Sequence, residues 1–165
     1  MSVLPGTEVE FTIEKEDWNI IELDDGTIIK MRTILTKIIR DPHAKPPPNV
    51  PPGVKGAGFT TTFHNIAVVH KANPGNMGKP TPLPVQKQDA ESVEVGFTEY
   101  SSPFNVYVLK IDDLPKPFKL KVKLVVSNVI KYVDLYDQFG YPMYNVNSTN
   151  AVVPTPPKKR RKRKG

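Results

Sequence analysis

The sequence predicts an all-β protein made of two tandem copies of one small unit, followed by a basic tail. The main observation is a stretch that occurs twice. Ile29–Arg40, IKMRTILTKIIR, aligns without a gap with Leu120–Lys131, LKVKLVVSNVIK, 91 residues further along the chain. The second observation is that no segment shows a helical period with a cap, whereas alternation of apolar and polar residues recurs throughout. An internal repeat has to be considered before any fold is assigned.

The repeat extends toward the N-terminus at an offset of 86 residues. Glu8–Thr12 matches Glu94–Thr98, and Trp18–Ile20 matches Phe104–Val106. Both matches occur in the same order in the two copies, which makes a chance origin unlikely for them. We therefore expect two units related by an approximate two-fold axis, each a small barrel-like or sandwich unit.

An insertion in a turn accounts for the change of offset from 86 to 91. The first copy turns through Asp24–Thr27, and the second turns through Asp112–Pro117. A weaker echo, Ala67–Val69 against Ala151–Val153, is short enough to arise by chance.

Four strands are predicted in the first copy. Glu8–Ile13 alternates apolar and polar residues, as a half-buried strand does. Trp18–Leu23 and Ile28–Arg40 flank Asp25-Gly26, a strong signal for a two-residue hairpin turn. Phe59–Lys71 closes the copy.

The long stretch Ile28–Arg40 is predicted as a strand rather than a helix, because branched side chains lose rotamer freedom in helices. Its character changes midway, since from Ile34 onward both faces are largely apolar. This pattern fits a strand that bends across a small barrel. It fits equally well a strand in the interface between the two copies.

The second copy repeats this arrangement with strands at Ser92–Tyr100, Asn105–Ile111, Phe118–Val133 and Met143–Val153. The predicted organisation is a first β repeat over residues 1–75, a linker over 76–89, a second repeat over 90–157 and a disordered tail over 158–165. A proline-rich loop at residues 41–58 interrupts the first repeat, because its proline run cannot join a strand ladder.

Parts of the sequence resemble a known group of proteins. Asp17–Thr27, DWNIIELDDGT, resembles the opening of short uncharacterised prokaryotic β proteins. Tyr136–Tyr144, YDQFGYPMY, and Asn147–Val153, NSTNAVV, resemble their close. Each copy is thus similar to one such chain, and Asp41–Gly58 departs from the pattern. The resemblance brings no established activity.

The charge of the chain is concentrated at one end. The formal net charge is +6, but seven cations lie between Lys158 and Lys164, so 16 basic side chains remain against 17 acidic ones. Like-charged runs of this kind stay disordered until they meet a polyanion. No apolar run reaches the length of a membrane span, and the N-terminus lacks signal-peptide features, so a cytoplasmic location is expected.

Candidate catalytic and metal-binding residues are sparse. The chain has no cysteine, no G-x-S-x-G motif and no phosphate-binding glycine loop, so neither an enzyme nor a cofactor is expected. His64 and His70 lie on one strand face but about 20 Å apart, too far to share an ion. Asp24-Asp25 and Asp112-Asp113 suit turns, where aspartate bonds the backbone, better than a metal site.

The basic residues carry the functional prediction. A flexible cationic strip suits a phosphate backbone, and cations next to tyrosines could serve single strands, RNA more than DNA. The predicted nucleic-acid-binding residues are Lys158, Lys159, Arg160, Arg161, Lys162, Arg163, Lys164, Lys119, Lys121, Lys123, Lys30 and Arg32. The predicted platforms are Tyr107, Tyr132, Tyr136, Tyr141 and Tyr144.

Alternatives to this hypothesis remain open. The tail could only improve solubility or contact some other acidic surface, and the cationic strand faces could be solvated surface. The alternative function is a protein–protein adaptor that uses β edges or the proline-rich loops. The oligomeric state is left open.

Overall fold

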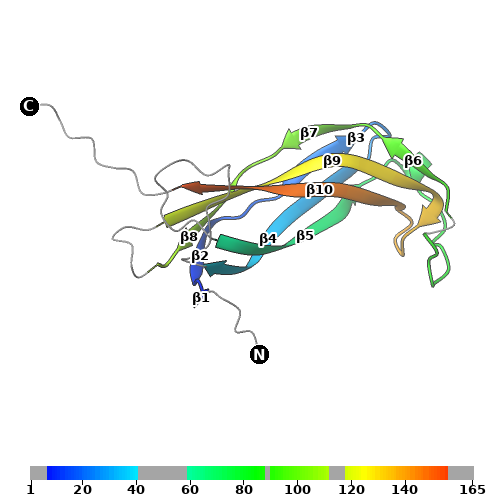
Figure 1. Cartoon of the computed structure of the whole chain (residues 1–165). Coiled ribbons are helices and arrows are strands. Elements are labelled where there is room, and N and C mark those ends of the chain that lie inside the picture. Colours follow the sequence, from blue (N-terminus) through cyan, green and yellow to red (C-terminus); the bar gives the residue numbers. More distant parts are fainter. Residues whose placement is uncertain (1–6, 41–58, 88–89, 112–117, 156–165) are drawn as a thin grey trace, which may run out of the picture.

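The structure is a computed structural model, and it describes residues 7–40, 59–87, 90–111 and 118–155. In this part of the chain the protein is all-β, with two five-stranded antiparallel sheets and one short 3₁₀ helix, η1 (Pro74–Asn76) (Figure 1). The all-β prediction is confirmed. The predicted proline-rich loop at 41–58 and the basic tail lie outside the described residues.

Sheet A is built around the long strand β4. One edge of β4 (Ile28–Arg40) pairs with β5 (Phe59–Lys71), and its other edge pairs with β1 (Thr7–Glu8) at one end and β3 (Asn19–Leu23) at the other. β7 (Phe97–Ser101) completes the sheet beside β3.

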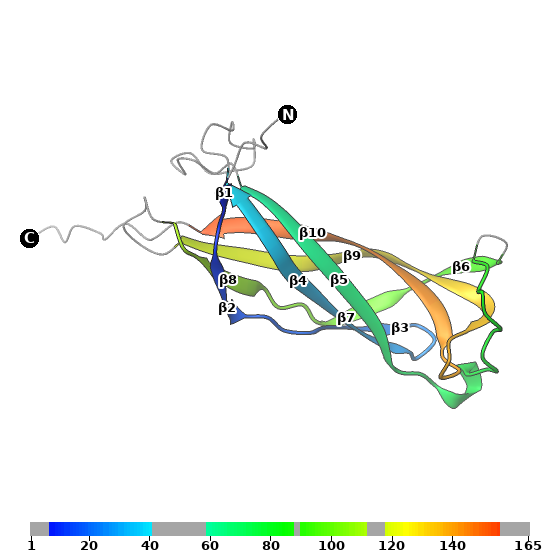
Figure 2. The ribbon, with the colours of Figure 1, turned by 90° about the horizontal axis from the view of Figure 1, so that it is seen from below.

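Sheet B has the same plan around the strand β9. One edge of β9 (Phe118–Tyr136) pairs with β10 (Pro142–Thr155), and its other edge pairs with β6 (Ser92–Val95) and β8 (Asn105–Leu109). β2 (Phe11–Lys15) completes the sheet beside β8. Figures 1 and 2 show β4 and β5 on one side of the molecule and β9 and β10 on the other.

The two halves of the chain exchange strands. β2 follows β1 closely but belongs to sheet B, and β7 follows β6 but belongs to sheet A. The single strands predicted at Glu8–Ile13 and Ser92–Tyr100 were therefore wrong, because each run is divided between two sheets. At the crossings, Lys110 N–H donates to Glu10 O (2.8 Å), and Asp24 N–H donates to Gly96 O (2.9 Å).

Strand register is equivalent in the two sheets. The pairs Glu8–Ile39, Asn19–Met31 and Phe11–Leu109 correspond to Glu94–Ile130, Asn105–Val122 and Phe97–Leu23. These pairs keep the offsets of 86 and 91 residues found in the sequence. The weaker echo is out of register by one residue, because Ala67 lies opposite Met31, whereas Val152 lies opposite Val122.

Two apolar clusters fill the space between the sheets, one toward each end. The first packs the second half of β4 on β8 and the first half of β9, and the second packs β3 and the first half of β4 on the rest of β9. Their buried members are Val9, Leu35, Ile38, Tyr107, Leu109, Phe118, Leu120 and Val122 in the first and Ile21, Leu23, Ile29, Met31, Leu124, Val126 and Val129 in the second. Both sheets stay open, so the described strands form a sandwich and not a closed barrel.

A one-residue bulge in each long strand explains the apolar pattern that begins at Ile34. Thr36 is left unpaired in β4, and Ser127 is left unpaired in β9. An extra residue shifts the alternation of side chains by one place. Leu35 and Ile38, three residues apart, are therefore both buried. The sequence suggested burial on both faces from Ile34 onward, but the bulge keeps one face in the core.

Candidate nucleic-acid interface

The predicted cations of the body lie on the outer faces of the two sheets. Lys30 and Arg32 alternate along β4 with buried residues, and Lys119, Lys121 and Lys123 do the same along β9. Each of the five is half-buried, so its aliphatic stem covers the sheet while its charged end reaches solvent. The prediction that they share a strand face is confirmed within each strand.

An aromatic ring lies under the cations of sheet A. Lys30 Nζ is 5.7 Å from the centroid of the Trp18 ring, and the Arg32 guanidinium is 5.5 Å from it. Trp18 immediately precedes β3, which pairs with β4 in register, and this pairing brings the ring to the cations. Cations at these distances are attracted by the negative face of the indole.

Sheet B carries the equivalent arrangement. Lys123 Nζ is 5.5 Å from the centroid of Phe104, whose side chain is 39% exposed. Phe104 corresponds to Trp18 at the offset of 86, and Lys123 corresponds to Arg32 at the offset of 91. We call these two arrangements the cation–aromatic sites. The matching Trp18–Ile20 and Phe104–Val106 runs were the sequence signal for them, but the sequence did not show which cations they meet.

The tyrosines predicted as stacking platforms make other contacts. Tyr107 is fully buried and belongs to the first apolar cluster, so it offers no platform. Tyr132 lies under Lys87 (5.5 Å) and Tyr144 under Lys131 (6.0 Å), while Tyr141 packs against Phe139. These cations are not the predicted ones on β4 and β9.

Glu16 organises the site on sheet A. Its carboxylate pairs with Arg32 Nε at 3.1 Å and accepts a hydrogen bond from the Tyr107 hydroxyl at 2.9 Å. Burial of the ring, together with the nearby Glu16 carboxylate, raises the pKa of Tyr107 to about 12. Arg32 is thus held in place by an acidic partner, which also reduces the net positive charge of the site.

The remaining cations differ in how they are paired. Lys119 forms an exposed ion pair with Glu14 at 2.9 Å. Among the described residues, Lys30, Lys121 and Lys123 form no ion pair. Of these three lysines, Lys30 lies beside Trp18 and Lys123 beside Phe104.

Asp25 has the turn role predicted for it and a further role across the sheets. Its Oδ1 accepts the Thr27 N–H (2.9 Å), and the Gly26 φ of 88° lies in the left-handed region that glycine favours. Its Oδ2 accepts the Tyr144 hydroxyl (2.6 Å) and pairs with Lys131 (3.3 Å). Burial alone would raise the pKa of Asp25, but the hydrogen bonds from Tyr144, Thr27 and Lys131 leave this pKa below its ordinary value.

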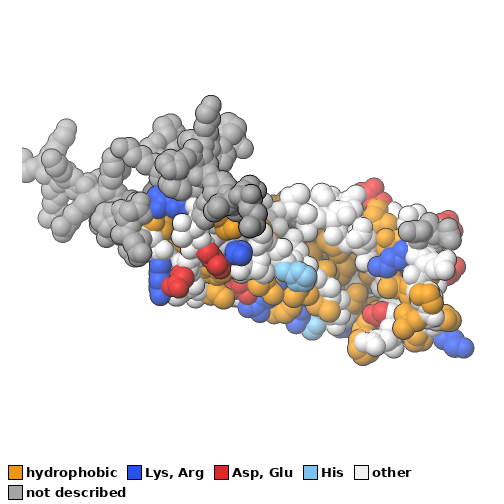
Figure 3. Space-filling model, turned by 60° about the horizontal axis from the view of Figure 1, so that its bottom comes forward, with side chains coloured by type: hydrophobic (Ala, Val, Ile, Leu, Met, Phe, Trp, Pro, Cys, Tyr) orange, Lys and Arg blue, Asp and Glu red, His pale blue; other side chains and the backbone are white. Residues whose placement is uncertain are grey.

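Neither histidines nor carboxylates form a metal site in the described residues, where no group of three potential ligands converges. His64 and His70 are both exposed on β5. The prediction that they share a strand face stays a prediction, because the pairing with β4 passes from Val69 to Lys71 and leaves His70 unpaired. They are the two pale-blue side chains in Figure 3, and hydrophobic side chains lie near both. Asp112-Asp113 lies outside the described residues.

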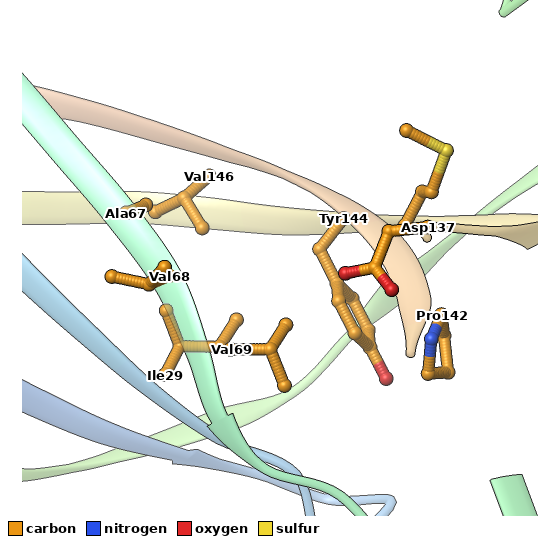
Figure 4. A pocket seen from close by; sticks show the side chains of 9 residues that line it. Ile29, Ala67, Val68, Val69, Asp137, Pro142, Tyr144 and Val146 are labelled. Atoms are coloured by element: carbon orange, nitrogen blue, oxygen red, sulfur yellow. The ribbon is translucent and has the colours of Figure 1, made fainter. Parts of the chain in front are cut away.

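An apolar groove of about 180 Å³ runs between β5 and β10. Figure 4 shows Ala67, Val68 and Val69 on one side of it, with Tyr144 and Pro142 on the other. Tyr144 lines this groove and bonds Asp25, so two titratable groups with shifted pKa values meet beside it. Burial, followed by the Asp25 carboxylate, raises the pKa of Tyr144, whereas that of Asp25 is lowered. Both shifts move away from neutral pH, opposite to what acid–base catalysis needs.

The predicted tail residues Lys158–Lys164 lie outside the described residues. No helix in the described part of the chain is both long and apolar enough to cross a membrane. No protein-family model, curated protein or solved structure matches the chain.

Proposed function

We propose that the protein is a non-enzymatic nucleic-acid-binding protein, with RNA or a ribonucleoprotein as its partner. The observation that carries this proposal is the pair of cation–aromatic sites, in which Trp18 and Phe104 occupy equivalent positions beside cations of the long strands. Single-stranded nucleic acids are bound by aromatic side chains that stack on bases and by cations that contact the backbone. A cytoplasmic location belongs to the same proposal.

The tail Lys158–Lys164 supplies most of the affinity in this proposal. The rest of the chain carries 16 basic and 17 acidic side chains, so it has little general attraction for a polyanion. Seven adjacent cations release counterions from the phosphates that they neutralise. Binding by the tail is therefore salt-sensitive and indifferent to sequence, while the cation–aromatic sites add a preference for unpaired bases.

The absence of catalysis is part of the proposal. A pair of titratable groups with shifted pKa values beside a groove, as Asp25 and Tyr144 are, counts against this part of the proposal, but the hydrogen bonds of Asp25 favour a structural role. Asp25 already accepts hydrogen bonds from Tyr144, Thr27 and Lys131, so its oxygens are occupied by the protein itself. The pair therefore fits a role in joining the two sheets.

The test compares the full chain with a chain that ends at Pro157, using fluorescently labelled RNA and DNA over a range of salt concentrations. We expect the truncation to remove most of the affinity and to flatten the salt dependence. Absence of binding by the full chain at low salt would overturn the proposal. It would favour the alternative, a protein–protein adaptor, which the long edge strands β5 and β10 support, since they carry one charged side chain between them.

A second set of variants tests the body. Trp18→Ala and Phe104→Ala should weaken binding to single strands, because base–aromatic stacking is worth about 1–3 kcal/mol per base. Phe139→Ala is the matched control, since Phe139 is exposed but packs against Tyr141. If the truncated chain keeps its affinity for nucleic acid, replacing Lys119, Lys121 and Lys123 by alanine should abolish this remaining affinity.

We also propose that the two halves arose by duplication of one unit and are related by an approximate two-fold axis. Equivalent strand order, equivalent register and equivalent bulges at Thr36 and Ser127 support this proposal. An experimental structure tests it by superposition of residues 8–40 on 94–131. A rotation far from two-fold would contradict the symmetry.

A further inference from the structure

The sheet edges of this protein differ sharply in length and charge. Four edge strands are short, with two to five residues, and each carries at least one charged side chain: β1, β2, β6 and β7. β5 has 13 residues and one charge, at its last residue Lys71, and β10 has 14 residues and none. Short strands and charged side chains are the usual protection of edges against pairing with other chains. β5 and β10 lack both.

β5 is the better suited of the two for pairing. It contains no proline and six β-branched residues, whereas β10 has proline near both ends and several asparagines. In the described residues β5 pairs with β4 alone. β10 meets it through side chains, as in the hydrogen bond from Asn65 Nδ2 to Asn150 Oδ1 (2.9 Å). The other backbone edge of β5 is thus left for a partner.

We propose that β5 pairs antiparallel with β5 of a second copy of this chain, which joins two copies of sheet A into one continuous sheet. The register that overlaps the whole strand centres on Asn65, the midpoint of Phe59–Lys71. Thr62 then lies opposite the partner's Val68, and His64 lies opposite the partner's Ile66. No acidic or basic side chains of like charge face each other in this register.

Side-chain exposure agrees with a second copy as the occupant. Val68 is 48% exposed and Ile66 is 36% exposed on the outward face of β5. The stretch from Thr60 to His70 carries no acidic side chain, lysine or arginine. In the proposed register, self-pairing places Val68 beside the partner's Thr62 and Ile66 beside the partner's His64. The pairing does not depend on nucleic-acid binding.

Charge substitutions at Thr62 and Val68 test the proposal and its register. In a Thr62→Glu/Val68→Glu chain, like charges face each other twice across the interface, which opposes pairing. Within one copy the new carboxylates lie beside Lys37 and Lys30, so the fold itself is not opposed. A Thr62→Lys/Val68→Lys chain gives the complementary charges.

The measurement is the mass in solution, by light scattering and by sedimentation over a wide concentration range. We expect the unmodified full chain to show twice the monomer mass, each double variant to show the monomer mass, and their equimolar mixture to recover the dimer. The matched control is Thr149→Glu/Val153→Glu on β10, which should leave the dimer intact. Circular dichroism checks that each variant is folded.

The remaining outcomes overturn the proposal. An unmodified chain that is monomeric at all concentrations shows that the β5 edge stays unpaired. A dimer that the β5 variants leave intact, or that the β10 control dissociates, places the interface elsewhere. A mixture of folded, oppositely charged chains that stays monomeric excludes the register centred on Asn65.

Discussion

The buried side chains of Asn19 and Asn105 donate hydrogen bonds to the central strand of the opposite sheet at equivalent places. Asn19 Nδ2 donates to Leu124 O at 3.2 Å, and Asn105 Nδ2 donates to Thr33 O at 3.0 Å. Thr33 and Leu124 correspond at the offset of 91 residues, as Asn19 and Asn105 do at 86. These two bonds therefore help to fix the sheets against each other within a mainly apolar interior.

Replacement of these asparagines tests their contribution to stability. Asn19→Ala and Asn105→Ala should each lower the free energy of unfolding by about 1–3 kcal/mol, because a buried carbonyl loses its donor. We expect the larger loss for Asn105→Ala, since Asn105 Oδ1 also accepts the Asp17 N–H (3.1 Å). The residue equivalent to Asp17 is Pro103, which has no N–H. Urea unfolding provides the measurement, and equal losses would contradict the ranking.

Deletion of one bulge residue should prevent folding. Without Ser127, the side chains on one side of the deletion would exchange faces, so that either Val126 or Val129 would turn out of the core. Ser127→Ala keeps the extra residue and loses only the hydrogen bond from Ser127 Oγ to Asn147 O (2.9 Å). Circular dichroism and urea unfolding compare the two. A deletion variant as stable as the alanine variant would show that the bulge does not set the register.

Alkaline pH should lower the free energy of unfolding, because the buried Tyr107 hydroxyl loses its proton. The pKa of Tyr107 is about 12 in the folded state, against about 10 when the chain is unfolded. The folded state favours the protonated hydroxyl. The contribution of this hydroxyl to stability is therefore complete below pH 10 and is lost as the pH rises toward 12. Urea unfolding at pH 9 and pH 11.5 should show a larger loss for the unmodified chain than for Tyr107→Phe. A loss of equal size would contradict this assignment.

Acid should also lower the free energy of unfolding, in this case because the Asp25 carboxylate gains a proton. Its folded-state pKa lies below the ordinary 3.8, so its contribution is present above that pH and is lost as the pH falls through the folded value. Between pH 7 and pH 2.5, Asp25→Asn should therefore lose less stability than the unmodified chain. The exposed neighbour Asp24→Asn is the matched control, measured by the same urea series. If the free energy of unfolding falls by the same amount in the unmodified chain and in Asp25→Asn, Asp25 is not the source of the acid sensitivity.

The sequence predicted the long strands better than their surroundings. The bounds of Ile28–Arg40 and Phe59–Lys71 agree with β4 and β5, because a high content of β-branched residues is a local signal for a strand. The turn at Asp25-Gly26 also agrees, since glycine and aspartate determine it locally. The exchange of β2 and β7 was missed because Glu8–Ile13 alternates without interruption across the point where the chain changes sheets.

The candidate site was predicted only in part, because its contacts depend on strand pairing and not on local sequence. The cations of β4 and β9 could be placed on one strand face from their spacing alone. Their aromatic partners could not, because Trp18 reaches Lys30 only through the pairing of β3 with β4. Glu16 gave no local signal either, as its contacts with Arg32 and Tyr107 come from different sheets.

Strand exchange also determines when the chain can fold during its synthesis. Phe11 of β2 pairs with Leu109 of β8, so sheet B stays incomplete until residues 98 positions later have left the ribosome. Contacts of such long range make folding slow. The N-terminal half is therefore made first but has to wait for the other half, with the long edge of β5 uncovered. For this protein, the interval before release from the ribosome is when a chaperone would protect it most.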